Sequence, residues 1–419
     1  MPDVLIKDLT HDVTPVGSHK IEVQKENNDS AFSTLTEIFA NNNFFATVEL
    51  GHATDSTLAR PAAGRMQVEG EEVLTTKDLS ATLSAAQQAK LLKNIAALLH
   101  GQCRLSKSGS NLLLSPHNGN CLIINSLVER VPDAGVMLAA PSDTVTMTIA
   151  SPCVVTWNNH GLAAGSPVKF STSGALPTGI TAGTTYYVIA AGLTSNAFEI
   201  SATPGGAAVN TSGSQSGTHK IGTLRCIYAY MNSGTMTLEA STTTHATQAG
   251  TGVEIKSGDA TRTLVGMAYD SSTAWVDSVA QRFVRSWFNR KRTPLKNNFT
   301  VDRSTTSTSL IELNSEIRVE FLLWADEAPL LCASGGTYHT NSGSVVTTAL
   351  GIDDVSTATN ATQIGAPGSS LVATISTGPS LIDGMSEGYH FCTLLGSTNN
   401  GTGSWYSPTV SRFSLMGGI

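Results

Sequence analysis

Ala86-Gln-Gln-Ala-Lys-Leu-Leu-Lys-Asn-Ile-Ala96 is the stretch that decides how this 419-residue chain is organised, because it predicts a helix whose apolar stripe needs a partner. Residues 85–99 contain no glycine or proline, and the side chains of Asp78 and Ser80 ahead of them are suited to capping a helix N-terminus. Apolar residues recur at three- and four-residue steps and form one stripe: Ala85, Ala89, Leu92, Ile95 and Leu99.

A single helix of this length is only marginally stable in water, so its apolar stripe must be buried. Identical stripes from neighbouring chains would bury one another in a short coiled coil of two or three strands. Packing of the helix against its own domain is the alternative, and the periodicity fits both arrangements equally. The five stripe residues are therefore the candidate oligomerisation residues.

Two sequence motifs in this region resemble parts of bacteriophage tail fibres. Residues 86–96 are similar to a short helix of these fibres. The run Asp55-Ser-Thr-Leu-Ala-Arg-Pro-Ala-Ala-Gly-Arg-Met-Gln-Val-Glu-Gly70 is similar to their neck element D-x-T-L-x-R-x-x-A-G-x-x-x-V-E-G. The resemblance implies a trimerising neck over residues 48–100, and a homotrimeric virion appendage rather than an enzyme.

Residues 1–47 predict a strand, a turn, a second strand and a capped helical turn, in Val4-Leu-Ile-Lys-Asp-Leu9, Lys20-Ile-Glu-Val-Gln24 and Ser33-Thr-Leu-Thr-Glu-Ile-Phe39. The pattern resembles the N-terminal module by which many phage fibres attach to the tail or to a preceding virion protein. A segment with so few apolar side chains cannot bury a core by itself, so an arm that orders on binding is also consistent. The candidate attachment residues are Ile6, Leu9, Ile21, Val23, Leu35 and Ile38.

Beyond residue 100, short apolar runs separated by glycine, proline, asparagine and serine predict β-strands, as in Cys121-Leu-Ile-Ile and Leu224-Arg-Cys-Ile-Tyr-Ala-Tyr230. The segment between them carries an H-G-L turn, an L-P-x-G-I-x-x-G-T-x-Y-Y-V run and an N-x-F-x-I-S strand. These motifs resemble a small β-domain that recurs in phage tail and fibre proteins. We therefore expect residues 148–222 to be inserted into a discontinuous β-domain formed by residues 101–147 and 223–297.

Residues 298–419 alternate apolar and polar positions over seven or eight short runs, which predicts a β-sandwich of jelly-roll type. No fixed-period repeat is visible, which argues against a long β-helix of the tailspike kind. The predicted fold class is therefore mainly β, with an N-terminal attachment module, a short coiled-coil neck helix, and then β-sandwich domains with an inserted small β-domain.

Composition excludes several classes of protein. Only 14% of the residues are charged and the formal net charge is −7, so the chain as a whole is not predicted to bind nucleic acid. No apolar run approaches the ~20 residues that a membrane helix needs, and the N-terminus lacks a secretory signal pattern. We expect assembly in the host cytoplasm. The six cysteines lack zinc spacing and are predicted to be unpaired core residues.

The sequence predicts no enzymatic activity, no metal and no cofactor. Glycoside cleavage needs two convergent carboxylates, and adjacent strand residues point to opposite faces. Asp383 and Glu387, in a glycine-rich loop, are the one pair that could converge, although solvated loop acids are the simpler interpretation. No nucleophile elbow or phosphate loop is present.

A basic cluster interleaved with Trp287 and Phe288 could contact nucleic acid or an anionic polysaccharide. Against that, the run also reads as a strand end followed by a solvated loop before Pro294, or as a contact with an acidic neighbour in the virion, and we favour this structural or subunit contact. The cluster consists of Arg282, Arg285, Arg290, Lys291, Arg292 and Lys296.

Aromatic residues in predicted loops of the last domain are the candidate receptor contacts, because binding residues collect on loops. They are Tyr338, His339, Trp405 and Tyr406. The predicted function is a virion structural protein, a tail-fibre-like appendage that contacts other phage tail or virion proteins and binds a host-surface polysaccharide or protein. The alternative is a purely structural collar, head-fibre or decoration protein without receptor contact.

Overall fold

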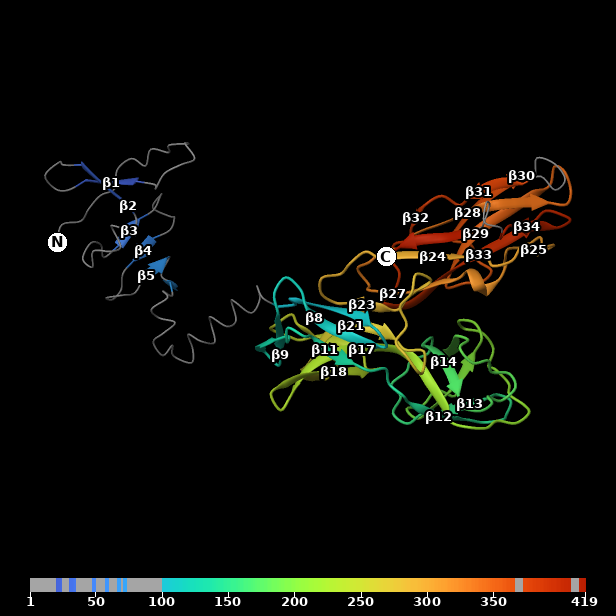
Figure 1. Cartoon of the computed structure of the whole chain (residues 1–419), viewed down its shortest axis with the longest axis horizontal. Helices are drawn as coiled ribbons and strands as arrows, with labels where there is room; N and C mark the ends of the chain where they lie inside the picture. The colour runs from blue at the N-terminus through green and yellow to red at the C-terminus, as the bar shows by residue number, and fades with distance from the viewer. Residues whose placement is uncertain are drawn as a thin grey trace. The chain divides into compact units, whose positions relative to one another are not determined.

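The structure, a computed structural model, describes residues 100–365, 372–407 and 414–419, together with six short strands earlier in the chain. The chain divides into two units, Met1–Lys93 and Asn94–Ile419. Regular structure in the described residues is β, apart from the single 3-10 turn η1 (Ser315–Ile317). The mainly β prediction is confirmed (Figure 1). The predicted neck helix, with its stripe residues Ala85, Ala89, Leu92, Ile95 and Leu99, lies outside the described residues.

The first unit contains two small sheets. An antiparallel hairpin joins β1 (Lys20–Gln24) to β2 (Ser30–Thr34), and β1 coincides with the second predicted strand. A helical turn was expected to begin at Ser33, but Ser33 and Thr34 end β2. The second sheet has the order β3-β4-β5-β6, with bounds Thr47–Glu49, Thr57–Ala59, Met66–Val68 and Glu71–Val73.

The structure describes two of the six candidate attachment residues. Ile21 and Val23 lie in β1, for which the structure gives the backbone. Ile6, Leu9, Leu35 and Ile38 lie outside the described residues.

The discontinuous β-domain is built from strands on both sides of the insert. Alternation fixes their faces: in β8, Leu112 and Leu114 are buried and Leu113 is half-buried. Leu105, Ile227 and Val265 pack in the same core. The strands are β7 (Cys103–Ser108), β8 (Asn111–Pro116), β9 (Cys121–Ile124), β10 (Leu127–Arg130), β11 (Val136–Leu138), β18 (Thr235–Ser241), β19 (His245–Thr247), β20 (Glu254–Lys256), β21 (Asp259–Tyr269) and β23 (Val284–Ser286), with part of β17 (His219–Asn232).

The inserted β-domain has its own apolar core, which includes Phe170, Phe198 and Ile200. Val145 and Met147 belong to this core, so the insert begins before the predicted boundary at residue 148. Its strands are β12 (Thr144–Met147), β13 (Val154–Thr156), β14 (Pro167–Thr172), β15 (Tyr186–Val188), β16 (Ala197–Ser201) and the start of β17.

Strand β17 runs without interruption through the predicted boundary at residues 222 and 223. Its first part pairs with β12 and β14, and its later part pairs with β21 and β18. At the crossing, a Cβ on Gly222 would lie 2.1 Å from the Ser272 nitrogen and 2.3 Å from the Asp270 carbonyl oxygen. Only glycine allows that turn to approach the strand so closely.

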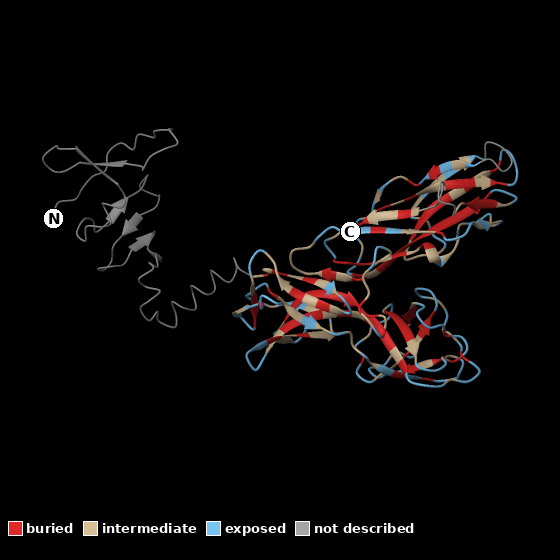
Figure 2. Cartoon of the chain, viewed as in Figure 1, coloured by how far each residue is buried: buried red, intermediate tan, exposed pale blue. Residues whose placement is uncertain are grey.

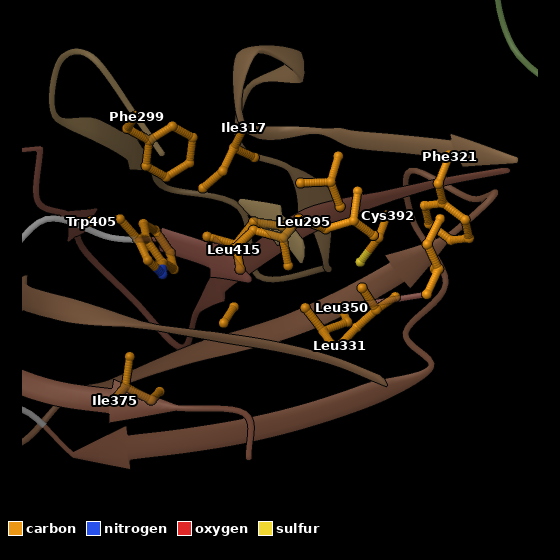
Figure 3. Close-up of a cluster of buried hydrophobic side chains, with 14 of the residues drawn as sticks. Leu295, Phe299, Ile317, Phe321, Leu331, Leu350, Ile375, Cys392, Trp405 and Leu415 are labelled. Carbon is orange, nitrogen blue, oxygen red and sulfur yellow. The ribbon is translucent and has the colours of Figure 1, made fainter. Parts of the chain in front are cut away.

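The last β-domain consists of two sheets that enclose one core. Trp405, Leu331 and Leu415 from one sheet pack with Phe321 and Leu350 from the other (Figure 3). The predicted sandwich is confirmed, and the jelly-roll assignment stays a prediction. One sheet has the order β22-β27-β33-β29-β30 with β26, and the other β24-β35-β28-β34-β25 with β31 and β32.

The sandwich starts before the predicted residue 298, because β22 pairs with β27, β24 pairs with β35, and Leu295 lies in the core. The strands are β22 (Gln281–Arg282), β24 (Pro294–Asn298), β25 (Arg303–Thr305), β26 (Ile311–Glu312), β27 (Val319–Leu323), β28 (Leu330–His339), β29 (Val345–Ile352), β30 (Asn360–Gly365), β31 (Ala373–Ser376), β32 (Ser380–Leu381), β33 (Gly388–Thr398), β34 (Gly403–Trp405) and β35 (Ser414–Gly418).

An aromatic cluster joins the discontinuous β-domain to the sandwich. Tyr228, Tyr269 and Phe283 pack with Leu322 and Trp324, and all five side chains are buried. Buried positions lie mainly on strands and exposed positions mainly on the connecting loops (Figure 2). The two domains therefore bury apolar side chains against each other and are not joined by a linker alone.

Candidate receptor-contact site

Tyr338 and Tyr406 form an aromatic pair on the outer side of the sandwich. Their ring centroids are 5.0 Å apart with an interplanar angle of 36°, and both side chains are half-buried. The pairing of β28 with β34 brings them together, and the backbone nitrogen of Tyr406 donates to the Gly336 carbonyl oxygen at 2.9 Å. Two adjacent, partly exposed rings offer a contact surface that loses little conformational entropy when a ligand binds.

The Tyr406 phenol stays protonated under ordinary conditions. Desolvation raises its pKa, and the neighbouring Tyr338 and Asp302 act in the same direction. A protonated phenol can both donate and accept hydrogen bonds to a ligand. Asp302 is fixed beside it, because it accepts a hydrogen bond from the Ser407 backbone nitrogen at 2.8 Å.

His339 and Trp405 were predicted to be loop residues at the surface, and this prediction is wrong. Both are fully buried. The Trp405 Nε1 donates to the Thr348 hydroxyl at 2.8 Å, inside the sandwich. The glycines around Trp405 suggested a loop, but residues 403–405 form β34, and alternation along that strand turns the indole inward.

His339 holds two loops of the sandwich together. Its Nε2 lies 2.7 Å from the Thr398 hydroxyl and 2.5 Å from the Asn400 carbonyl oxygen, while Nδ1 accepts from the Asn341 backbone nitrogen at 2.8 Å. These bonds satisfy both ring nitrogens, so the side chain is structural. Of the four predicted receptor contacts, the structure brings Tyr338 and Tyr406 together at the surface.

A charged cleft that the sequence did not reveal lies where the discontinuous domain meets the sandwich. His245 Nδ1 lies 2.6 Å from Glu254 Oε2, and Nε2 lies 2.9 Å from Glu387 Oε1. The bond to Glu387 raises the His245 pKa to about 9, burial opposes the shift, and Glu254 adds to it. The cleft has a volume of about 440 Å³, and Trp287 and Asp326 also line it.

Both members of the carboxylate pair that was weighed for glycoside cleavage have hydrogen-bond partners. Glu387 is bound to His245, while Asp383 Oδ1 accepts a hydrogen bond from the Gly384 nitrogen. Asp354 accepts backbone hydrogen bonds from Ser356 and Thr357, which lower its pKa to about 2. Each of these acids therefore has a local structural partner.

No family model matches this chain, and no curated protein matches it. Two solved structures of one virus are similar to it. The infectious bursal disease virus Gx strain structure has a TM-score of 0.23 and 10% identity, over 67% of this chain and 73% of that chain. The infectious bursal disease virus VP2 subviral particle has a TM-score of 0.25 and 11% identity, over 69% and 74%. Likenesses at this level do not carry an argument about function.

Three of the six residues in the basic cluster, Arg282, Arg285 and Arg290, contact acidic groups of the same chain. Arg285 pairs with Glu327, and Arg290 pairs with Asp326 and lies 4.8 Å from the Trp287 ring centroid. These pairs join the discontinuous domain to the sandwich, which favours the structural interpretation of the cluster. The described residues include no helix that is long and apolar enough to cross a membrane, and no group of three or more metal-binding side chains.

Proposed function

We propose that this chain is a tail-fibre-like structural protein of a bacteriophage virion, a homotrimer that attaches through residues 1–47 and presents its β-domains to the host surface. The virion part of the proposal rests on the motif resemblances in residues 55–70 and 86–96. The host-contact part rests on one observation, the partly exposed Tyr338–Tyr406 pair on the sandwich. Three copies on one stalk would gain avidity from weak individual contacts.

Inhibition of phage adsorption tests this proposal. We expect the purified trimer, its mass verified by light scattering, to block adsorption of the parent phage to host cells at micromolar concentration. The double variant Tyr338→Ala/Tyr406→Ala should lose blocking by about tenfold or more, since each ring contributes about 1 kcal/mol or more to a surface contact. Tyr230→Ala is the matched control, because Tyr230 is a half-buried tyrosine on β18's partner strand β17, under the Arg262 guanidinium.

The adsorption experiment distinguishes failure of host binding by this chain from failure of the tyrosine pair as the receptor site. A folded trimer that does not block adsorption would favour the alternative, a collar, head-fibre or decoration protein without receptor contact. Blocking that survives the double variant would keep the receptor site on this chain but remove it from the tyrosine pair.

A further inference from the structure

The inserted β-domain carries a groove that is distinct from the surfaces described above. It lies along β12, at the end of β13 and beside the loop before β17, with a volume of about 610 Å³. That volume lies within the usual range for small-molecule sites. The lining contains no carboxylate, ammonium or guanidinium group, and consists of Thr144, Val145, Thr146, Met147, Thr156, Trp157, Asn158, Gln215, Ser216, Gly217, Thr218 and His219.

Trp157 is held as a fixed platform in this lining. The Arg225 guanidinium lies 5.4 Å from the Trp157 ring centroid, and Arg225 is itself buried and does not line the groove. Two carboxylates fix Arg225, Asp143 at 2.6 Å and Asp270 at 2.8 Å. The Trp157 backbone nitrogen also donates to the Asn196 carbonyl oxygen at 2.9 Å. A half-buried indole that is braced in this way is ready to stack without an ordering cost.

Hydrogen-bonding groups surround the indole. Thr144 and Thr146 alternate with the buried Val145 and Met147 along β12, so both hydroxyls point outward, and Thr146 is paired in register with Thr156 on β13. These three exposed threonine hydroxyls have no hydrogen-bond partner among the described residues. They are available to a ligand.

Hydrogen bonds link the polar side chains of Gln215 and His219 in the lining of the groove. Gln215 Nε2 donates to the Met147 carbonyl oxygen at 2.7 Å, and its Oε1 lies 3.0 Å from His219 Nε2. His219 Nδ1 lies 2.9 Å from the Thr172 hydroxyl. These bonds restrict both side chains before a ligand enters, which lowers the entropy cost of binding.

We propose that this groove binds a neutral oligosaccharide, with a pyranose ring on Trp157 and sugar hydroxyls on Thr144, Thr146, Thr156 and Asn158. An aromatic platform surrounded by hydroxyl and amide groups suits a ligand with apolar ring faces and many hydroxyls. Nucleic acid or an acidic glycan would need cationic groups to offset its charge, and the lining has none. The site would add a second kind of contact to a host-binding protein, but it needs neither the trimer nor the tyrosine pair.

A glycan array with the labelled full-length protein tests the ligand class. It should carry neutral oligosaccharides, uronic-acid and sialylated glycans, and a single-stranded oligonucleotide. We expect binding to neutral members, followed in titration by a shift of the Trp157 indole NMR signal with a Kd of about 1 mM or tighter. Array binding confined to acidic glycans or nucleic acid, or no binding to any neutral member, would overturn the proposal.

Two variants locate the binding in the groove. Trp157→Ala should weaken it by about tenfold or more, and Thr146→Val, which removes one hydroxyl at nearly constant volume, by about threefold. Thr237→Val is the matched control on β18, outside the groove, and should leave the affinity unchanged. Unchanged binding in a folded Trp157→Ala protein would also overturn the proposal. The assay measures binding directly, so its outcome is independent of whether the protein blocks phage adsorption.

Discussion

Nε2 of His245 lies 2.9 Å from Oε1 of Glu387, so a histidine of the discontinuous domain is bound to a carboxylate of the sandwich. The other ring nitrogen is bound to Glu254 of its own domain, in strand β20. Positive charge on the imidazole therefore stabilises the junction of the two domains. The same junction contains the pairs Arg285–Glu327 and Arg290–Asp326.

This contact predicts a pH-dependent stability. The His245 pKa rises from 6.5 to about 9 on folding, so its contribution is fully present below about pH 6.5 and is lost as the pH rises through about 9. We expect the melting temperature of His245→Gln to lie below that of the wild type at neutral pH, with a gap that narrows toward about pH 10. Differential scanning calorimetry across this range measures the gap, and a gap that stays constant would contradict the prediction.

Asp270 is fully buried, and its carboxylate accepts hydrogen bonds from Arg225 Nε and from the Ser272 backbone nitrogen. Asp270→Ala should lower the free energy of unfolding by about 3–5 kcal/mol, because it leaves Arg225 buried with one carboxylate fewer. Asp326→Ala is the control, since Asp326 is mostly exposed and its removal should cost no more than about 1 kcal/mol. Urea denaturation provides both values, and equal losses in the two variants would refute the assignment.

Gly396 lies directly under the Trp405 indole. A Cβ at this position would lie 2.6 Å from Trp405 Cη2, and the ring cannot move away in a filled core. Gly396→Ala should therefore destabilise the protein by about 1–3 kcal/mol. At Gly365, also in a strand of this sandwich, a Cβ would meet nothing within 4 Å, so Gly365→Ala should be close to neutral. A neutral Gly396→Ala in thermal melts would show that the indole is not packed as described.

A substitution at Trp405 tests whether this side chain is structural or contacts a receptor. Trp405→Phe removes the indole donor to Thr348, whose hydroxyl is fully buried, and should cost about 1–3 kcal/mol in urea denaturation. Adsorption blocking by the folded variant should equal that of the wild type. A variant of unchanged stability that had lost blocking would return Trp405 to the receptor surface.

Strand positions were readable from the sequence where one face of a strand is buried. The runs at residues 121–124 and 224–230 became β9 and part of β17, because alternation or continuous apolarity reports burial directly. Residues 317–324 read as one continuous run in the sequence, but the structure divides them between the end of η1 and β27. Asn314 caps the start of η1, because its side chain accepts a hydrogen bond from the Glu316 backbone nitrogen at 2.9 Å.

The candidate site was less accessible to sequence reasoning because it depends on pairing between distant segments. Tyr338 and Tyr406 meet only because β28 pairs with β34, and His245 meets Glu387 from another domain. Glycine around Trp405 indicated a loop, whereas the short β34 places the indole inward. Trp157 is visible in the sequence as an aromatic residue beside the H-G-L turn. The groove around it, however, is also formed by β12 and residues 215–219, which the sequence does not place next to it.

Strand β17 is shared by the inserted domain and the discontinuous domain, so the number of residues before Gly222 affects which way its later side chains face. Since side chains alternate along a strand, one residue added or removed at Gly222 would turn every later side chain of β17 to the opposite face. Tyr228, which now packs in the aromatic cluster, would exchange places with a neighbour such as Ile227, which packs in the core of the discontinuous domain. A domain exchanged between related chains would therefore have to preserve the alternation of side chains along β17 as well as the length of the strand.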